Sequence, residues 1–158
     1  MTPKTPVSWS PERAAEIVET HAGRLGALLP ILHDLQAAFG CVPSEATPFL
    51  AQALNLTRAE VHGVISFYHD FRSVPAGRRT VRLCRAEACQ SLGADALAAH
   101  VHRRLGIDWH DTTADGAVTL EPVFCLGLCA IGPSAMLDGA PLGRLDDARI
   151  DAVLERAR

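Results

Sequence analysis

The sequence contains no run of about eighteen consecutive apolar residues, the shortest length from which a membrane-spanning helix is predicted. Its first residues also lack the apolar stretch of a secretory signal. We therefore expect a protein with no membrane segment, located in the cytoplasm. That compartment keeps thiols reduced, so paired cysteines there more often bind metal than form disulfides.

Motifs for common nucleotide and hydrolase sites are absent as well. The chain has no P-loop, no G-x-G-x-x-G and no Ser-His-Asp pattern, so we expect no catalytic residue and no nucleotide or flavin site on it. The formal net charge is −3, from 15 Lys and Arg against 18 Asp and Glu. The basic run at residues 78–82 is too short to follow a phosphate backbone, so nucleic acid is not an expected partner.

The sequence does contain four cysteines arranged in two close pairs. Four residues separate Cys84 from Cys89, and three separate Cys125 from Cys129. Each pair can place two thiolates on one metal atom, and two pairs supply the four sulfurs of a [2Fe–2S] cluster. Gly127 lies inside the second pair and Gly132 just after it, and glycine allows the backbone to approach a bulky group closely. These four cysteines are therefore the candidate cofactor-binding and metal-binding residues.

Spacing alone leaves two other interpretations open. Structural zinc sites use the same ligands and tolerate these gaps, so a zinc-stabilised interaction module is one alternative. Disulfides or unliganded thiols are the other, although the odd total of five cysteines and the expected compartment disfavour disulfides. The fifth residue, Cys41, stands alone and is interpreted as a small, partly buried side chain. The seven histidines show no spacing that would add ligands.

The hydrophobic pattern changes at residues 73–77 from one typical of helices to one that also indicates strands. Before that break, residues 10–72 predict a four-helix segment with short connections. Ser10 and Ser44 are predicted helix starts, and Thr57 and Glu60 form a capping-box pattern at the start of the fourth helix.

After the break, alternating residues predict strands at 80–83 and 118–123, with a helix from about 91 to 105 between them. An Asp138-Gly139 turn predicts a hairpin, and a final helix follows. We therefore predict an α+β fold, in which the four-helix segment precedes a thioredoxin-like βαβ…ββα domain at residues 78–158.

These motifs together resemble the thioredoxin-like [2Fe–2S] ferredoxin family. The resemblance is carried by Cys-x4-Cys, a gap of thirty-five residues and Cys-x3-Cys, and by residues 28–36, 39–43 and 54–71 of the helical segment. The family includes the 24 kDa subunit of respiratory NADH dehydrogenase and equivalent subunits of NAD-linked hydrogenases and formate dehydrogenases. Within it, residues 84–93, which read Cys-Arg-Ala-Glu-Ala-Cys-Gln-Ser-Leu-Gly, most resemble the gamma subunit of molybdenum-containing NAD-dependent formate dehydrogenase.

The resemblance implies a non-catalytic electron-transfer subunit of an NAD-dependent oxidoreductase. Cys84 and Cys89 would hold one iron, and Cys125 and Cys129 the other. The cluster would exchange single electrons with FMN on an NAD-binding partner subunit. Further iron–sulfur clusters and a molybdenum cofactor would lie on partner subunits, including the large formate dehydrogenase subunit. Respiratory NADH-quinone oxidoreductase and NAD-linked hydrogenase are the alternative complexes, and the helical segment is expected to dock onto the flavin subunit.

Overall fold

The computed structural model describes residues 8–157. The chain divides into two compact units, and the division falls between Pro75 and Ala76. The buried clusters of each unit are built from residues of that unit. Residues 1–7, which carry the prediction that no secretory signal is present, lie outside the described residues.

The first unit is helical. Its helices are α1 (Pro11–Glu19), α2 (Leu28–Phe39), α3 (Ala46–Ala53) and α4 (Arg58–Phe67). Ser10 caps α1, because its hydroxyl oxygen accepts a hydrogen bond from the backbone N–H of Arg13. The predicted capping box of Thr57 and Glu60 forms both of its hydrogen bonds at the start of α4.

The core of the helical unit lies between these helices. Ile31, Leu32 and Leu35 of α2 are fully buried, as the three- and four-residue spacing of a single helix face predicts. Leu50 of α3 and Val61 of α4 are also fully buried in the same cluster. Most of this unit's stability therefore comes from the apolar faces of short helices packing together.

Two predicted helix starts are wrong by a few residues. Helix α3 begins at Ala46, because the hydroxyl of Ser44 donates to the carboxylate of Glu45 and makes no capping bond. The helix predicted from about residue 91 is α6 (Ala94–Leu105), which begins three residues later, and the short helix α5 (Glu87–Gln90) before it is an element that the sequence pattern does not indicate. Gly93 separates them, since its φ of +95° is left-handed and interrupts helical geometry.

The second unit is built on a mixed sheet. Within residues 76–157 its strands are β1 (Arg79–Cys84), β2 (Val118–Val123), β3 (Ala135–Leu137) and β4 (Ala140–Leu142), in the order β2-β1-β3-β4. Strands β1 and β2 are parallel, whereas β1–β3 and β3–β4 are antiparallel. The predicted α+β fold class is confirmed.

The hairpin between β3 and β4 follows the predicted turn chemistry. Asp138 and Gly139 have φ values of +48° and +87°, as a type I′ turn requires. Pro141 lies in β4, at an edge of the sheet, where its missing N–H removes no ladder hydrogen bond.

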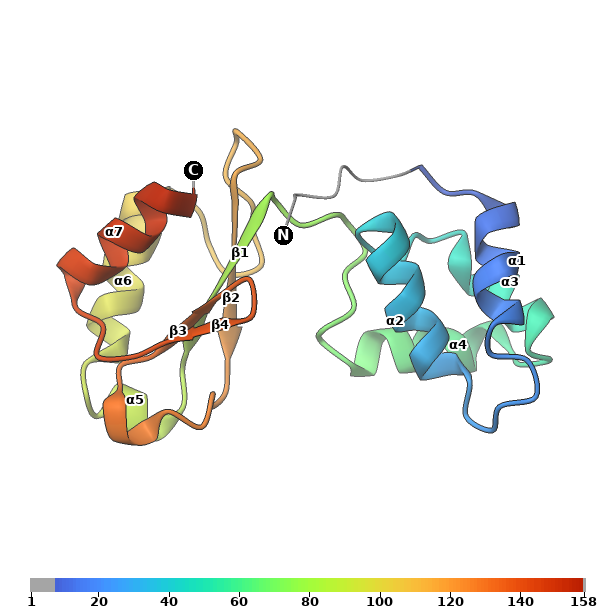
Figure 1. Ribbon diagram of the computed structural model, residues 1–158, viewed down its shortest axis with the longest axis horizontal. Coiled ribbons are helices and arrows are strands. Elements are labelled where there is room, and N and C mark those ends of the chain that lie inside the picture. The colour runs from blue at the N-terminus through green and yellow to red at the C-terminus, as the bar shows by residue number, and fades with distance from the viewer. Residues whose placement is uncertain (1–7, 158) are drawn as a thin grey trace. The chain divides into compact units, whose positions relative to one another are not determined.

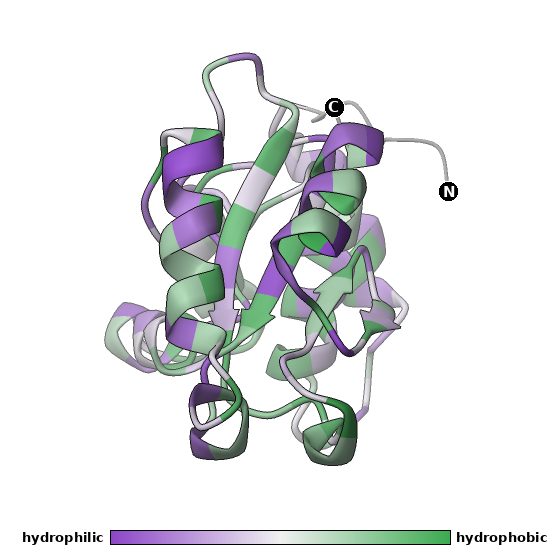
Figure 2. Ribbon diagram, turned by 90° about the vertical axis from the view of Figure 1, so that its left-hand side faces the viewer, coloured by the Kyte–Doolittle hydropathy of each residue, from purple (hydrophilic) through white to green (hydrophobic). Residues whose placement is uncertain are grey.

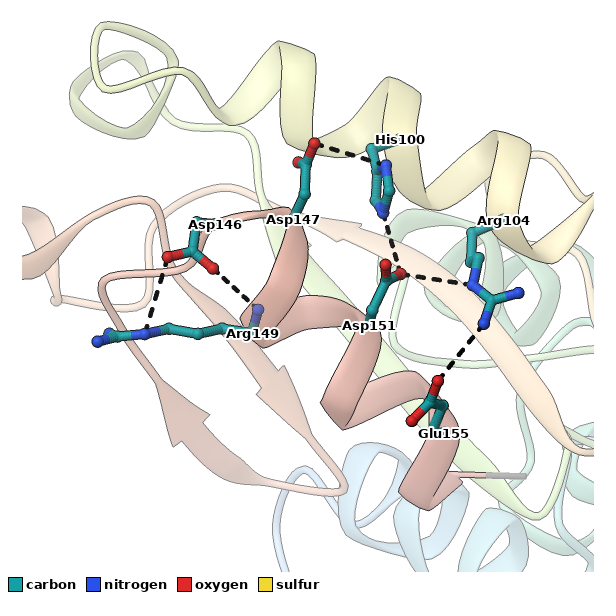
Figure 3. Close-up of polar contacts among 7 residues, drawn as sticks. All are labelled: His100, Arg104, Asp146, Asp147, Arg149, Asp151 and Glu155. Carbon is teal, nitrogen blue, oxygen red and sulfur yellow. Dashed lines mark hydrogen bonds and ion pairs between the residues drawn. The ribbon is translucent and has the colours of Figure 1, made fainter.

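Helices α6 and α7 (Asp147–Ala157) lie on the same face of this sheet (Figure 1). Both carry hydrophilic and hydrophobic residues, and their apolar sides enter one core with Leu120 of β2 (Figure 2). Polar side chains join the two helices where they face each other (Figure 3). His100 lies 3.0 Å from a carboxylate oxygen of Asp151 and 3.6 Å from one of Asp147, and Arg104 lies 3.6 Å from Glu155.

In the part of the chain that the structure describes, no helix is both long enough and apolar enough to cross a membrane.

Candidate metal centre

The two cysteine pairs come together because β1 and β2 run in the same direction. Cys84, the last residue of β1, is in register with Val123, the last residue of β2. The backbone N–H of Arg85 donates to the carbonyl of Val123 over 2.7 Å and so extends this pairing beyond the strands. The carboxyl ends of parallel strands meet at one edge of a sheet. The loops that follow therefore bring the Cys125 pair to the Cys84 pair.

The first pair is buried. Cys84 and Cys89 are 2 % and 1 % exposed, and they form a small cluster with Ala94. Cys89 lies in the short helix α5, whereas the sequence predicts a loop there. One helical turn places its side chain back towards the end of β1, which explains how a gap of four residues brings the two sulfurs to one place.

The second pair is exposed to solvent. Cys125 directly follows the exposed ring of Phe124, and Cys129 starts the 3-10 turn η1 (Cys129–Ile131). Their Sγ atoms are 3.8 Å apart. Two sulfurs bound tetrahedrally to one metal atom at about 2.3 Å are also separated by about 3.8 Å. This pair is therefore spaced to share one metal atom.

The loop of the second pair is held in an unusual backbone conformation. Cys125 has a φ of +87°, which residues with a side chain rarely adopt and which concentrates at functional sites. Gly127 also has a positive φ, +74°, and its backbone N–H donates to the Sγ of Cys125 over 3.3 Å. The loop thus directs a backbone donor at sulfur, as a negatively charged thiolate requires.

Residues 132–134, just before β3, form a third side of the site. The backbone N–H of Cys84 donates to the carbonyl of Ser134 over 3.0 Å, and the Ser134 hydroxyl lies 3.4 Å from the Sγ of Cys89. A Cβ atom on Gly132 would lie 3.2 Å from that same sulfur and 2.9 Å from a methyl group of Leu92. Because glycine has no Cβ, position 132 leaves space for the buried Sγ of Cys89.

The electrostatics show that the four sulfurs act on one another. Burial raises the pKa of Cys84, but hydrogen bonds to its sulfur outweigh burial, so the pKa is lowered. These hydrogen bonds come from the backbone of Ala86, from Cys89, from the backbone of Cys125 and from Ser134. The pKa of Cys129 is raised, first by its hydrogen bond and charge interaction with Cys125, then by burial and by the charges of Cys89 and Cys84. Four thiolates at this site repel one another, and bound cations would relieve that repulsion.

The residues present fit a two-iron cluster. They offer two sulfur pairs, with one pair at the separation of two ligands on one atom and backbone donors aimed at sulfur. Among the described residues, no three or more His, Cys, Asp or Glu side chains converge on a point that holds one metal ion. The donors are four sulfurs in two pairs, the number and grouping that a [2Fe–2S] cluster uses.

The other residues considered from the sequence lie elsewhere. Cys41 is buried in the helical unit at 6 % exposure, and burial followed by the nearby charge of Glu45 raises its pKa. His21 contacts Asp34, and the Nδ1 of His102 lies 2.8 Å from the backbone carbonyl oxygen of Ile107.

Gly132, which the sequence already suggests as a point of close backbone approach, lies at the site, whereas sequence reasoning missed Ser134. Ser134 follows the second cysteine pair closely in sequence, but a serine in a loop carries no specific signal. Only the antiparallel pairing of Leu83 with Ala135 brings this segment to the end of β1.

Comparison with known proteins identifies the kind of protein that this fold and site define. The family model of the thioredoxin-like [2Fe-2S] ferredoxin matches residues 14–158. The chain belongs to this family. The family resemblance and the [2Fe–2S] cofactor predicted from the sequence are confirmed, which leaves the zinc alternative without support.

Relatives with known roles are subunits of larger redox enzymes. The chain is 38 % identical over 135 residues to a subunit of the NADH-quinone oxidoreductase of Rhizobium meliloti (strain 1021), covering 85 % of this chain and 80 % of that protein. It is 32 % identical over 139 residues to the HndA subunit of the NADP-reducing hydrogenase of Solidesulfovibrio fructosivorans, covering 88 % and 81 %.

A solved structure agrees with these relatives. The crystal structure of an NAD+-reducing [NiFe]-hydrogenase in the air-oxidized state matches with a TM-score of 0.70 and 30 % identity. The match covers 83 % of this chain and 22 % of the hydrogenase chain, so this chain corresponds to one part of that longer protein.

Proposed function

We propose that this chain is the electron-transfer subunit of a cytoplasmic, NAD(P)-linked oxidoreductase complex of the NADH-quinone oxidoreductase or hydrogenase type. It exchanges single electrons with the FMN of a partner subunit that binds the nicotinamide nucleotide. The observation that carries the proposal is the meeting of two cysteine pairs at the carboxyl ends of β1 and β2. The relatives named above support the choice of complex.

Cys84 and Cys89 hold one iron in this proposal, and Cys125 and Cys129 hold the other. The bound cluster supplies a carrier for one electron at a time. The chain itself supplies the sulfur ligands, the backbone N–H of Gly127 as a donor to sulfur, and a protein wall around the buried pair. Because Cys125 and Cys129 are exposed, their side of the site is the side on which a partner approaches closely.

The proposal is tested by capturing the tagged chain from its native cells and identifying what comes with it. We expect a flavin-containing subunit, iron, acid-labile sulfide, and reduction of NAD or NADP by the captured complex. Membrane-bound NADH oxidation would assign the complex to the quinone reductase type, and hydrogen-dependent reduction of the nucleotide would assign it to the hydrogenase type. Capture of a colourless chain with zinc and without iron or flavin would contradict the proposal.

A second candidate complex is the molybdenum-containing NAD-dependent formate dehydrogenase. The sequence of residues 84–93 favours it, because the loop between the first two cysteines resembles that of its gamma subunit. The relatives named above favour the first candidate instead. In the same capture experiment, molybdenum and formate-dependent NAD reduction would select the formate enzyme, with its large molybdenum subunit as a further partner.

We further propose that the helical unit, residues 10–72, docks onto the flavin subunit. Its core contains none of the residues that surround the cysteines, so the cluster domain does not need it for its own packing. It also exposes aromatic surface at the C-terminal end of α4. Phe67 and Tyr68 are 73 % and 43 % exposed, and their rings meet edge to face at 5.1 Å. Exposed aromatic rings are frequent anchors of protein–protein interfaces.

Deleting residues 10–72 is expected to abolish co-purification of the flavin subunit while the isolated chain keeps the absorption and paramagnetic signal of its cluster. The exchange of Phe67 and Tyr68 for serine should weaken assembly in the same direction without unfolding the unit, because both side chains are exposed. Leu25→Ser is the matched control, since Leu25 is 98 % exposed in the same unit. Undiminished assembly of the deleted chain would rule out docking through this unit.

A further inference from the structure

Ser134 is a polar residue placed inside the sulfur site without being a ligand. Its side chain is 2 % exposed, and its hydroxyl oxygen lies 3.4 Å from the Sγ of Cys89, which is itself 1 % exposed. A buried hydroxyl group needs a hydrogen-bond partner, because leaving it unpaired costs its full desolvation. In the structure, this hydroxyl group pairs with a sulfur atom.

The backbone holds Ser134 rigidly in this position. Its carbonyl oxygen accepts a hydrogen bond from the N–H of Cys84, and the next residue, Ala135, pairs with Leu83 in the sheet. The serine is therefore positioned by β1, the same strand that carries the first sulfur ligand. The backbone thus places this residue beside the sulfurs, and its hydroxyl hydrogen can rotate to point at one of them.

Binding of a metal decides which atom donates. When Cys89 is a thiol, either Cys89 or Ser134 can donate the hydrogen bond between them. As metal-bound thiolates, Cys89 and Cys84 have no proton, and Ser134 hydrogen-bonds to both, so its O–H is the donor to the sulfurs of this pair. A donor to sulfur stabilises whichever redox state places more negative charge there, and that is the state with one more electron.

We propose that Ser134 is a positioning residue that raises the reduction potential of the cluster through a hydrogen bond from its hydroxyl to the Sγ of Cys89. The inference rests on the proposed ligand role of Cys89. Ser134 itself is not a ligand in this proposal. Its effect is on the reduction potential of the cluster, which the spacing of the cysteines does not determine.

The decisive comparison is between Ser134→Thr and Ser134→Val, because the two variants have the same shape and differ in the hydroxyl group. A redox titration followed by the paramagnetic signal of the reduced cluster gives the potential. We expect Ser134→Thr to stay near the original value. We expect Ser134→Val and Ser134→Ala to shift the reduction equilibrium about tenfold towards the oxidised state, which is about 59 mV lower for one electron.

Ser91→Ala is the matched control. Ser91 lies close to Cys89 in sequence, but its hydroxyl donates to the backbone carbonyl of Ala88, so its loss should leave the potential unchanged. Iron and sulfide content, measured on each variant, tests the ligand role separately from the role of the serine. Equal potentials for the Thr and Val variants would overturn the proposal. Loss of the cluster from every Ser134 variant, Thr included, would also overturn it, because packing alone would then explain the residue.

Discussion

Replacement of Cys125 by alanine is expected to reduce the bound iron and acid-labile sulfide from about two of each per chain to nearly none. The brown colour that bleaches with dithionite and the paramagnetic signal of the reduced protein should disappear with them. The reason is that one sulfur cannot replace two on the same iron. The same result is expected for alanine at Cys84, Cys89 and Cys129.

The serine variants refine this experiment. A serine oxygen can approach the same metal atom, so Cys→Ser at any of the four positions should change the spectrum even where iron is retained. Cys41→Ala is the control, because Cys41 is buried in the core of the other unit and should leave the cluster signal unaffected. A signal identical to that of the unaltered protein after any of the four cysteine replacements would refute the ligand assignment.

Replacement of Gly143 by alanine is expected to destabilise the cluster unit by about 1–3 kcal/mol, the usual cost of inserting a methyl group into a packed site. A Cβ atom at position 143 would lie 2.6 Å from the Cδ1 of Ile131 and 2.9 Å from its carbonyl oxygen. The side chain can move, but the carbonyl belongs to η1, the turn that begins at Cys129. The substitution should therefore lower stability and also displace a proposed ligand.

Two measurements check this expectation: the denaturant midpoint of unfolding, and the rate at which a chelator removes iron. Adding Ile131→Ala should recover part of the loss, because it removes the side-chain clash and leaves the carbonyl clash in place. Gly63→Ala is a suitable contrast, since a Cβ there meets nothing within 4 Å. If Gly143→Ala unfolds and releases iron as the unaltered protein does, the close packing of η1 against Gly143 does not constrain the site.

Local patterns predicted most of the secondary structure. The capping box at Thr57, the Asp138-Gly139 turn and the edge position of Pro141 depend on residues near one another in the chain, and each is present as expected. The errors occur where a contact or backbone conformation of a single residue overrides the helix that the pattern predicts. Ser44 donates to its neighbour Glu45, and the left-handed Gly93 moves the start of the helix predicted from about residue 91 to Ala94.

The sequence by itself determined the chemistry available to this protein: two close pairs of cysteines, no nucleotide motif, and a family in which such pairs carry a [2Fe–2S] cluster. The tertiary structure alone decided how the pairs meet and what surrounds them. Parallel pairing of β1 with β2 brings together residues thirty-five or more positions apart, and antiparallel pairing of β3 adds Gly132 and Ser134. Such contacts depend on which strands pair and in which register, and the burial of one sheet face against residues from other parts of the chain sets both.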